Sequence, residues 1–197
     1  QSWFFGLATI FPGIIVPVVP EYDPHLSRAS VTRDIEGARR LLADNGWTPA
    51  NLPVLVYGQT AGVKQRMFFE QLRAELMDIG WPQEKVVLKQ YATFGDISRA
   101  WKESRLPIVA KGWGLDYPDA ENTLQLFYGP NRSPGSNDAN YRNPAFDRLY
   151  EQASVMLPSA ERTALYRRMN QMVIDDCAAI SGIARKRIYL WHKNVVA

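Results

Sequence analysis

The stretch PIVAKGWGLDYPD occupies positions 107–119 of the 197-residue chain and is its most informative part. Its first half is a short apolar run, which is typical of a buried strand, here over 107–113. The strand leads into a turn that contains Trp113, Asp116 and Tyr117. Small molecules commonly bind α/β proteins at the carboxyl ends of the strands. We therefore expect these three side chains to contact a ligand.

A second informative stretch, NDANYRNPAFD at 137–147, ends a loop rich in Gly, Asn and Pro. Loops carry binding residues more often than core residues, so Asn140 and Tyr141 are further candidates for ligand contact. Neither stretch holds a nucleophile beside a base or a glycine-rich phosphate loop. His25 and His192 lie far apart, with no Cys or carboxylate at metal-ligand spacing. We expect a binding protein with no cofactor and no metal, rather than an enzyme.

Other roles remain open for the acidic residues of the turn. Asp116 could cap a helix or occupy a surface turn, and the aromatic residues beside it could belong to the core. Asp119 is predicted to cap a helical turn at 119–127, and Glu121 to be solvated. Asp116 and Asp119 could also form the paired carboxylates of a hydrolase, since the sequence does not set their separation.

The composition is that of a globular protein, with 46% hydrophobic and 22% charged residues. The length favours one domain over two. The net charge is only +3, although the pI is about 9.0, so nucleic acid is not an expected partner. Basic residues gather at 185–187 and 192–193, interleaved with apolar ones. This pattern predicts a strand with one solvated face, and a basic-tail interaction domain is the alternative.

The segment 3–19 carries no charge, which invites comparison with a membrane span. Pro12 and Pro17 interrupt it, and a helix interior tolerates proline poorly. No positively charged region precedes it, as a targeting signal would require. We expect extended chain packed against the rest of the protein.

Cys177 is the one cysteine, so no disulfide can form within the chain. Its neighbours include Val173, Ile174 and Ala178. The apolar setting predicts a buried, unreactive thiol in the core.

Strands and helices alternate in the predicted order of elements. Strands are expected at 54–57, 86–89 and 107–113, and helices at 32–45, 62–78, 94–104, from Asn143-Pro144 and from Pro158-Ser159. The tail 178–196 alternates enough for one or two further strands. Strand–helix–strand order implies right-handed crossovers, so the fold class is α/β with a mainly parallel sheet flanked by helices.

Taken together, five motifs resemble the carboxyl-terminal lobe of bacterial extracellular solute-binding proteins of family 5, the peptide and nickel binders of ABC importers. The motifs are Pro12-Gly13…Glu21-Tyr22-Asp23-Pro24, Gly112-Trp113-x-x-Asp116-Tyr117-Pro118-Asp119, Asn140-Tyr141-x-Asn143-Pro144-x-Phe146-Asp147, Arg162-x-x-x-Tyr166 and Trp191-x-Lys193-Asn194. Each motif alone is weak, but their order and spacing are specific, and the resemblance covers nearly the whole chain.

The resemblance implies one lobe of a type II periplasmic-binding-protein fold over 1–197. Residues 1–31 then form a linker-like segment, and 178–197 return towards a missing amino-terminal lobe. It also implies a non-catalytic protein, periplasmic or lipid-anchored, that closes two lobes around a peptide-like solute and delivers it to a membrane permease. Without the first lobe, apolar surface on 3–19 and 178–196 would be exposed, so we expect self-association.

The resemblance also assigns roles in the turn. In peptide-binding members, the Asp at the place of Asp116 pairs with the ligand's amino-terminal ammonium, and the Trp at the place of Trp113 packs nearby. An Arg that binds the ligand's carboxylate often stands six residues before that Asp. Here the position is Ala110, and the neighbouring Lys111 is expected to point to the opposite face of the strand.

Overall fold

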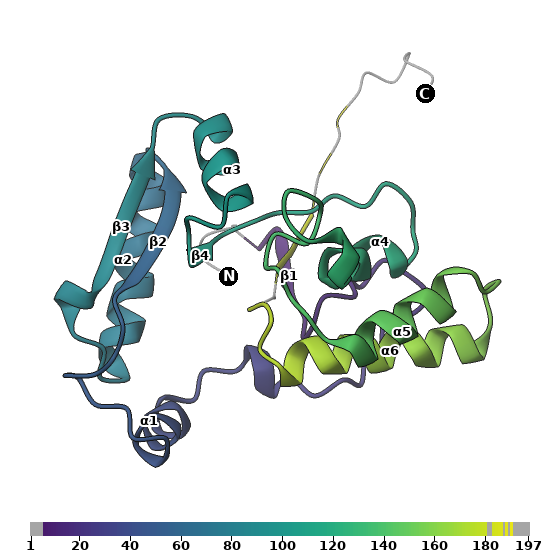
Figure 1. Cartoon of the computed structure of the whole chain (residues 1–197), viewed down its shortest axis with the longest axis horizontal. Helices are drawn as coiled ribbons and strands as arrows, with labels where there is room; N and C mark the ends of the chain where they lie inside the picture. Colours follow the sequence, from purple (N-terminus) through teal and green to yellow (C-terminus); the bar gives the residue numbers. More distant parts are fainter. Residues whose placement is uncertain (1–5, 181–182, 187, 189, 191–197) are drawn as a thin grey trace. The chain divides into compact units, whose positions relative to one another are not determined.

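The computed structural model of the chain describes residues 6–180, 183–186, 188 and 190, which form two compact units (Figure 1). Unit 1 comprises the residues up to 32, 115–128 and those from 143 on, and unit 2 comprises 33–114 and 129–142. The chain passes from unit 2 to unit 1 between Gly114 and Leu115, inside the turn described above.

Unit 2 contains a three-stranded parallel sheet in the order β3-β2-β4. The strands are β2 (Leu55–Thr60), β3 (Val86–Tyr91) and β4 (Ile108–Val109). Helix α2 (Val63–Asp78) connects β2 to β3, and α3 (Phe94–Lys102) connects β3 to β4 (Figure 1). The predicted α/β alternation and parallel sheet are confirmed in this unit, because parallel neighbours require such crossover connections.

Successive side chains of β2 point to opposite faces of the sheet, as a strand requires. Tyr57 packs with Phe69 of α2 on one face, whereas Val56 packs on the other against the cluster that contains Trp101 of α3. Gly58 lies so close to Leu106 that a Cβ atom there would come within 2.4 Å of its Cδ1. The sheet is therefore covered by a helix on each face, and position 58 has no room for a side chain.

The strand predicted over 107–113 is wrong in length, because only Ile108 and Val109 pair with β2. Residues 110–114 form no strand. Gly112 and Gly114 offer no side chain to pack on a sheet, which weakens a strand. The turn that contains Asp116 and Tyr117 is thus reached through unpaired chain rather than directly from the end of a strand.

Unit 1 is mainly helical, with a short strand pair. Its elements are β1 (Ala8–Ile10), α4 (Glu121–Leu124), α5 (Pro144–Ser154), α6 (Ala160–Asp175) and β5 (Ile183–Arg185). The predicted helix starts are confirmed: Asn143 and Ser159 are N-caps whose side chains accept from backbone N–H groups of α5 and α6. These two helices lie side by side in Figure 1.

The remaining elements are α1 and four short 3₁₀ turns. Helix α1 (Ile35–Asp44) lies in unit 2 and is capped by Asp34, which with Thr32 was one of two suitable N-caps for the helix predicted here. The 3₁₀ turns span Ala29–Val31, Gln83–Lys85, Gln125–Phe127 and Gly129–Asn131.

The amino-terminal segment of unit 1 packs against α6. Phe11, Ile15 and Val19 are buried. The side-chain oxygen of Asn170 accepts the N–H of Ile14 at 2.7 Å and that of Ile15 at 3.3 Å. The prediction of packed chain is thus confirmed for Phe11, Ile15 and Val19, whereas Leu7, Ile10 and Val18 are exposed, and bends and turns rather than extended chain follow β1. No helix among the described residues is long and apolar enough to cross a membrane.

The two ends of unit 1 meet as strands, since β1 pairs with β5 in antiparallel register, with Ala8 opposite Arg185. The strand in the basic tail was predicted, whereas β1 was not. The other basic positions, Arg187, His192 and Lys193, lie outside the described residues.

Cys177 is exposed, so the prediction of a buried thiol is wrong. Helix α6 ends at Asp175 with Asp176 as its C-cap, and Cys177 has a positive φ of 47°. The chain therefore leaves the helix before Cys177, and the buried face that includes Val173 does not extend to the thiol.

We expect Cys177 to react with Ellman's reagent in the folded protein nearly as fast as in denaturant, because the thiol already lies in solvent. Stopped-flow absorbance would measure both rates, and Cys177→Ser gives the blank. Labelling that is seen only after denaturation would contradict the exposed position.

Candidate functional site

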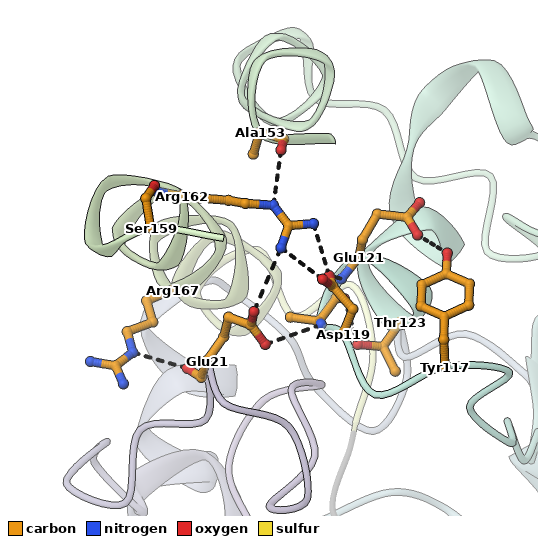
Figure 2. A network of polar contacts seen from close by, with 10 residues as sticks. Glu21, Tyr117, Asp119, Glu121, Thr123, Ala153, Ser159, Arg162 and Arg167 are labelled. Carbon is orange, nitrogen blue, oxygen red and sulfur yellow. Dashed lines mark hydrogen bonds and ion pairs between the residues drawn. The ribbon is translucent and has the colours of Figure 1, made fainter. Parts of the chain in front are cut away.

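Arg162 is the centre of a polar network in unit 1 (Figure 2). Its Nη1 and Nη2 donate to the two carboxylate oxygens of Asp119 at 2.7 and 3.1 Å, a two-pronged geometry that strengthens such pairs. Nε donates to the Ala153 carbonyl at 3.2 Å, and Nη1 lies 3.7 Å from Oε1 of Glu21. The side chains of Arg162 and Glu21 are only 8% and 7% exposed, so the charges are held largely away from water.

The helical period of α6 places Arg162 in the core. Positions 162, 166, 169 and 173 share one face of the helix, and all four residues are buried. The guanidinium lies over the ring of Tyr166, 4.6 Å from its centroid. Burial lowers the pKa of Arg162, but the hydrogen bond to Asp119 and the charges of Asp119 and Glu21 outweigh burial and raise it above its ordinary value.

Glu21 connects the amino-terminal segment to this network. Its Oε2 accepts the N–H of Ala120 at 3.3 Å. Arg167 of α6 donates to the carbonyls of Glu21 and Tyr22 at 2.9 and 3.0 Å. Motifs from three distant parts of the sequence, around positions 21, 119 and 162, are thus brought together by hydrogen bonds and ion pairs (Figure 2).

The turn itself is fixed by short-range hydrogen bonds. Asp119 Oδ1 accepts the N–H of Glu121, the first residue of α4, at 2.9 Å, so Asp119 satisfies a backbone donor at the start of the helix, although the N-cap position is that of Ala120. The ion pair of Asp119 with Arg162 was not predicted. The N–H of Asp116 donates to Asn122 Oδ1 at 3.4 Å, and the N–H of Asp119 donates to the Tyr117 carbonyl at 2.9 Å.

Glu121 accepts hydrogen bonds from two tyrosines, so the prediction that it is solvated is wrong. Tyr117 donates to Oε2 of Glu121, and Tyr150 of α5 donates to Oε1. The Tyr150 ring stacks on Tyr128 at a centroid distance of 4.5 Å. The hydrogen bond to Glu121 raises the pKa of Tyr117. Burial, followed by the same kind of hydrogen bond, raises the pKa of Tyr150.

Asp116 differs from the other two carboxylates of the turn. Its residue is exposed, and its carboxylate has no hydrogen-bond or ion-pair partner among the residues that the structure describes. Asp119 is bound by Arg162 and Glu121 by tyrosines. Asp116 is therefore the carboxylate of this turn that can pair with an external cation.

Trp113 lies in unit 2, where its ring is in contact with a lysine side chain. The Lys111 ammonium lies 5.3 Å from the Trp113 ring centroid, so the two side chains are on the same side of the chain. Lys111 also bonds to Asp138, whose side chain is only 9% exposed. A cation of the protein itself thus already contacts this aromatic ring.

Asn140 and Tyr141 stabilise the loop in which they lie. Asn140 has φ of 51°, donates to the Ser104 hydroxyl at 2.9 Å and accepts the Ser133 N–H at 3.2 Å. The backbone of Tyr141 exchanges two hydrogen bonds with the Asn137 side chain.

The five predicted site residues form two groups, with Asp116 and Tyr117 in unit 1, and Trp113, Asn140 and Tyr141 in unit 2. The arrangement gives no support to a hydrolytic pair, because both oxygens of Asp119 are bound to Arg162. Within the described ranges, no group of three or more His, Cys, Asp or Glu side chains could hold a metal ion.

Solved structures show the fold to be that of type II periplasmic binding proteins. HbpA2 from Haemophilus parasuis superposes with a TM-score of 0.79 at 21% identity, over 92% of this chain and 35% of that one. This agrees with the predicted fold class.

The chain belongs to the bacterial extracellular solute-binding proteins of family 5, whose model ("family 5 Middle") matches residues 1–135. This is a family of solute-binding proteins rather than enzymes. The chain is 27% identical to the periplasmic oligopeptide-binding protein OppA of Escherichia coli, over 74% of its own length and 26% of that protein. It is 25% identical to "Probable di/tripeptide-binding protein 5" of Pseudomonas aeruginosa, over 88% of its own length and 32% of that protein. It thus spans about a third or less of these relatives.

We expect Arg162→Met to lower the free energy of unfolding by about 3–5 kcal/mol, because it leaves two largely buried carboxylates without their cation. Urea denaturation followed by circular dichroism would measure it. Arg167→Met is the matched control, since that exposed side chain donates only to backbone carbonyls, and should cost at most about 1 kcal/mol. Equal costs for the two variants would show that the ion pairs do not hold the unit together.

Proposed function

We propose that this chain is part of a non-catalytic solute-binding protein of an ABC importer, and that it binds a peptide or another solute bearing an amine. The observation on which this rests is the Asp116 carboxylate, exposed and without a partner among the described residues, in a turn whose other carboxylates are bound. Membership of family 5 supports the solute-binding role. The names of the relatives, an oligopeptide-binding protein and a probable di/tripeptide-binding protein, support the solute class.

The charges near the site favour recognition of the amine over recognition of a carboxylate. Position 110 is Ala rather than a cation, and Lys111 is already paired with Asp138. The solute that fits best is a longer peptide or an amine held mainly through its positive end. Trp113, Tyr117, Asn140 and Tyr141 remain proposed ligand contacts.

At the level of the whole protein, we propose a periplasmic or lipid-anchored location and delivery of the solute to a membrane permease. The names of the relatives place such proteins in the periplasm. We further propose that residues 1–197 form one lobe and that 178–197 lead towards an amino-terminal lobe, which closes on this one around the solute.

The two alternatives have less support. A hydrolase would need Asp119 free to exchange a proton with substrate, whereas its carboxylate is bound by Arg162 and accepts a backbone N–H at the start of α4. A basic-tail interaction domain would need a strongly basic surface, and although Arg185 and Lys186 are exposed, the net charge of the chain is only +3.

Asp116→Asn should weaken binding of trialanine with a free amino terminus about tenfold, or about 1.4 kcal/mol, because the amide loses the charge-assisted hydrogen bond. N-acetyl trialanine, which has no ammonium, should bind weakly to both proteins. Calorimetry at millimolar peptide would measure the affinities. Asp44→Asn, an exposed carboxylate at the end of α1, should leave them unchanged. Equal affinity of the wild type for both peptides would remove Asp116 from the site.

We also propose that the chain self-associates through the β1–β5 ladder. A two-stranded ladder leaves two open edges, and this one exposes Leu7, Ile10 and Ile183 by 42%, 37% and 50%. Light scattering should show a mass that rises with concentration, and Ile183→Lys should abolish the rise because a charge disfavours edge pairing. Leu157→Lys, an exposed apolar position between α5 and α6, is the control and should not change it. A constant monomer mass would contradict the proposal.

A further inference from the structure

We infer that Glu121 is a positioning residue of the solute site: by accepting hydrogen bonds from Tyr117 and Tyr150 at once, it fixes the turn that presents Asp116. This inference rests on the proposed role of Asp116. It assigns to Glu121 no contact with the solute, because both of its carboxylate oxygens are occupied by phenol donors.

The geometry leads from the protein interior to the exposed turn. Tyr150 lies on α5, is 8% exposed and stacks on Tyr128, so it is held by packing. Its hydroxyl donates to one oxygen of Glu121, whose other oxygen accepts from Tyr117 (Figure 2 shows the latter contact). Tyr117 is 45% exposed. The buried tyrosine thus orders the carboxylate, and the carboxylate orders the exposed ring.

Tyr117 directly follows Asp116, so fixing its side chain restricts the backbone on one side of the binding carboxylate. On the other side, the N–H of Asp116 is bonded to Asn122, which neighbours Glu121 on α4. Glu121 and Asn122, which are adjacent on α4, therefore restrict the backbone on both sides of Asp116. Glu121 does so through the Tyr117 side chain, and Asn122 through the Asp116 N–H. A carboxylate held in place before binding loses less conformational freedom when the solute arrives, and this raises affinity without adding a contact.

The structure also offers a matched pair of the same chemistry that makes no hydrogen bond to the turn. Tyr128 donates to Glu151 of α5 at 2.8 Å, which is likewise a tyrosine–glutamate hydrogen bond. Glu151 makes no hydrogen bond or ion pair with residues 116–122 in the part of the chain that the structure describes. Glu121→Gln and Glu151→Gln remove the same charge and keep the same shape, but Glu121 bonds to the turn directly, whereas Glu151 is connected to it only through the stacking of Tyr128 on Tyr150.

The test measures binding of trialanine to the 197-residue chain by NMR titration, together with the ionisation of Tyr117 in samples with ¹³Cζ-labelled tyrosine. We expect Glu121→Gln and Tyr117→Phe to weaken binding about threefold, less than loss of the Asp116 charge itself, because only pre-organisation is lost. Glu151→Gln should leave the affinity unchanged. The hydrogen bond to Glu121 raises the pKa of Tyr117, so Glu121→Gln should lower that pKa towards its ordinary value of about 10. A merely structural role would not single out the phenols that bond to Glu121, which are those of Tyr117 and Tyr150.

Three outcomes would overturn the inference. The first is unchanged affinity in Glu121→Gln with a lowered Tyr117 pKa, which would show that the clamp exists but does not serve binding. The second is equal loss in Glu121→Gln and Glu151→Gln, which would indicate general destabilisation. The third is an NMR resonance of the Asp116 amide that does not change in Glu121→Gln, which would show that Glu121 does not position Asp116. This measurement needs no ligand. Failure of the wild type to bind trialanine would instead overturn the proposed function, on which the inference rests.

Discussion

The arrangement of unit 1 depends on the largely buried guanidinium of Arg162. Removing such a cation and its carboxylate partners from water costs several kcal/mol per ion, and this cost is recovered only if the geometry is good and the remaining polar atoms are bonded. Both conditions hold here. Asp119 meets the guanidinium with both oxygens, Ala153 accepts from its third nitrogen, and the second oxygen of Glu21 accepts a backbone N–H. A buried pair of this kind specifies one arrangement of the chain more than it adds stability.

That arrangement determines which carboxylate of the turn remains available. Three acidic residues fall within six positions, and their like charges would repel one another if all stood free. Arg162 neutralises Asp119, and two phenol donors disperse the charge of Glu121. Asp116 keeps its charge exposed to solvent. The turn can therefore be rigid and still offer one strong acceptor, because different side chains perform the two tasks.

The sequence predicted the features that local periodicity and capping encode. The helices of unit 2, the N-caps Asn143 and Ser159 and the parallel order of strands follow from apolar spacing and turn chemistry. The predictions were wrong where the structure depends on more than the local sequence pattern. The length of β4 depends on its partner β2, and the burial of Cys177 depends on where α6 ends. The role of Glu121 requires Tyr150, 29 positions later, which no local pattern reveals.

One missed feature did have a signal in the sequence. Arg162 stands at the helical spacing of Tyr166, Met169 and Val173, so a cation occupies a position on an otherwise apolar face. A buried cation requires a buried anion, and the acidic residues with neighbouring turn signals are the candidates for it. Which of Asp116, Asp119 and Glu121 pairs with Arg162 can be decided only from the structure. The three residues lie close together in the sequence, and the sequence does not show which side chain points towards the guanidinium. The same choice separates two roles: the acid that binds Arg162 belongs to the scaffold, and the acid left without a partner among the described residues, Asp116, is the one we propose for the solute.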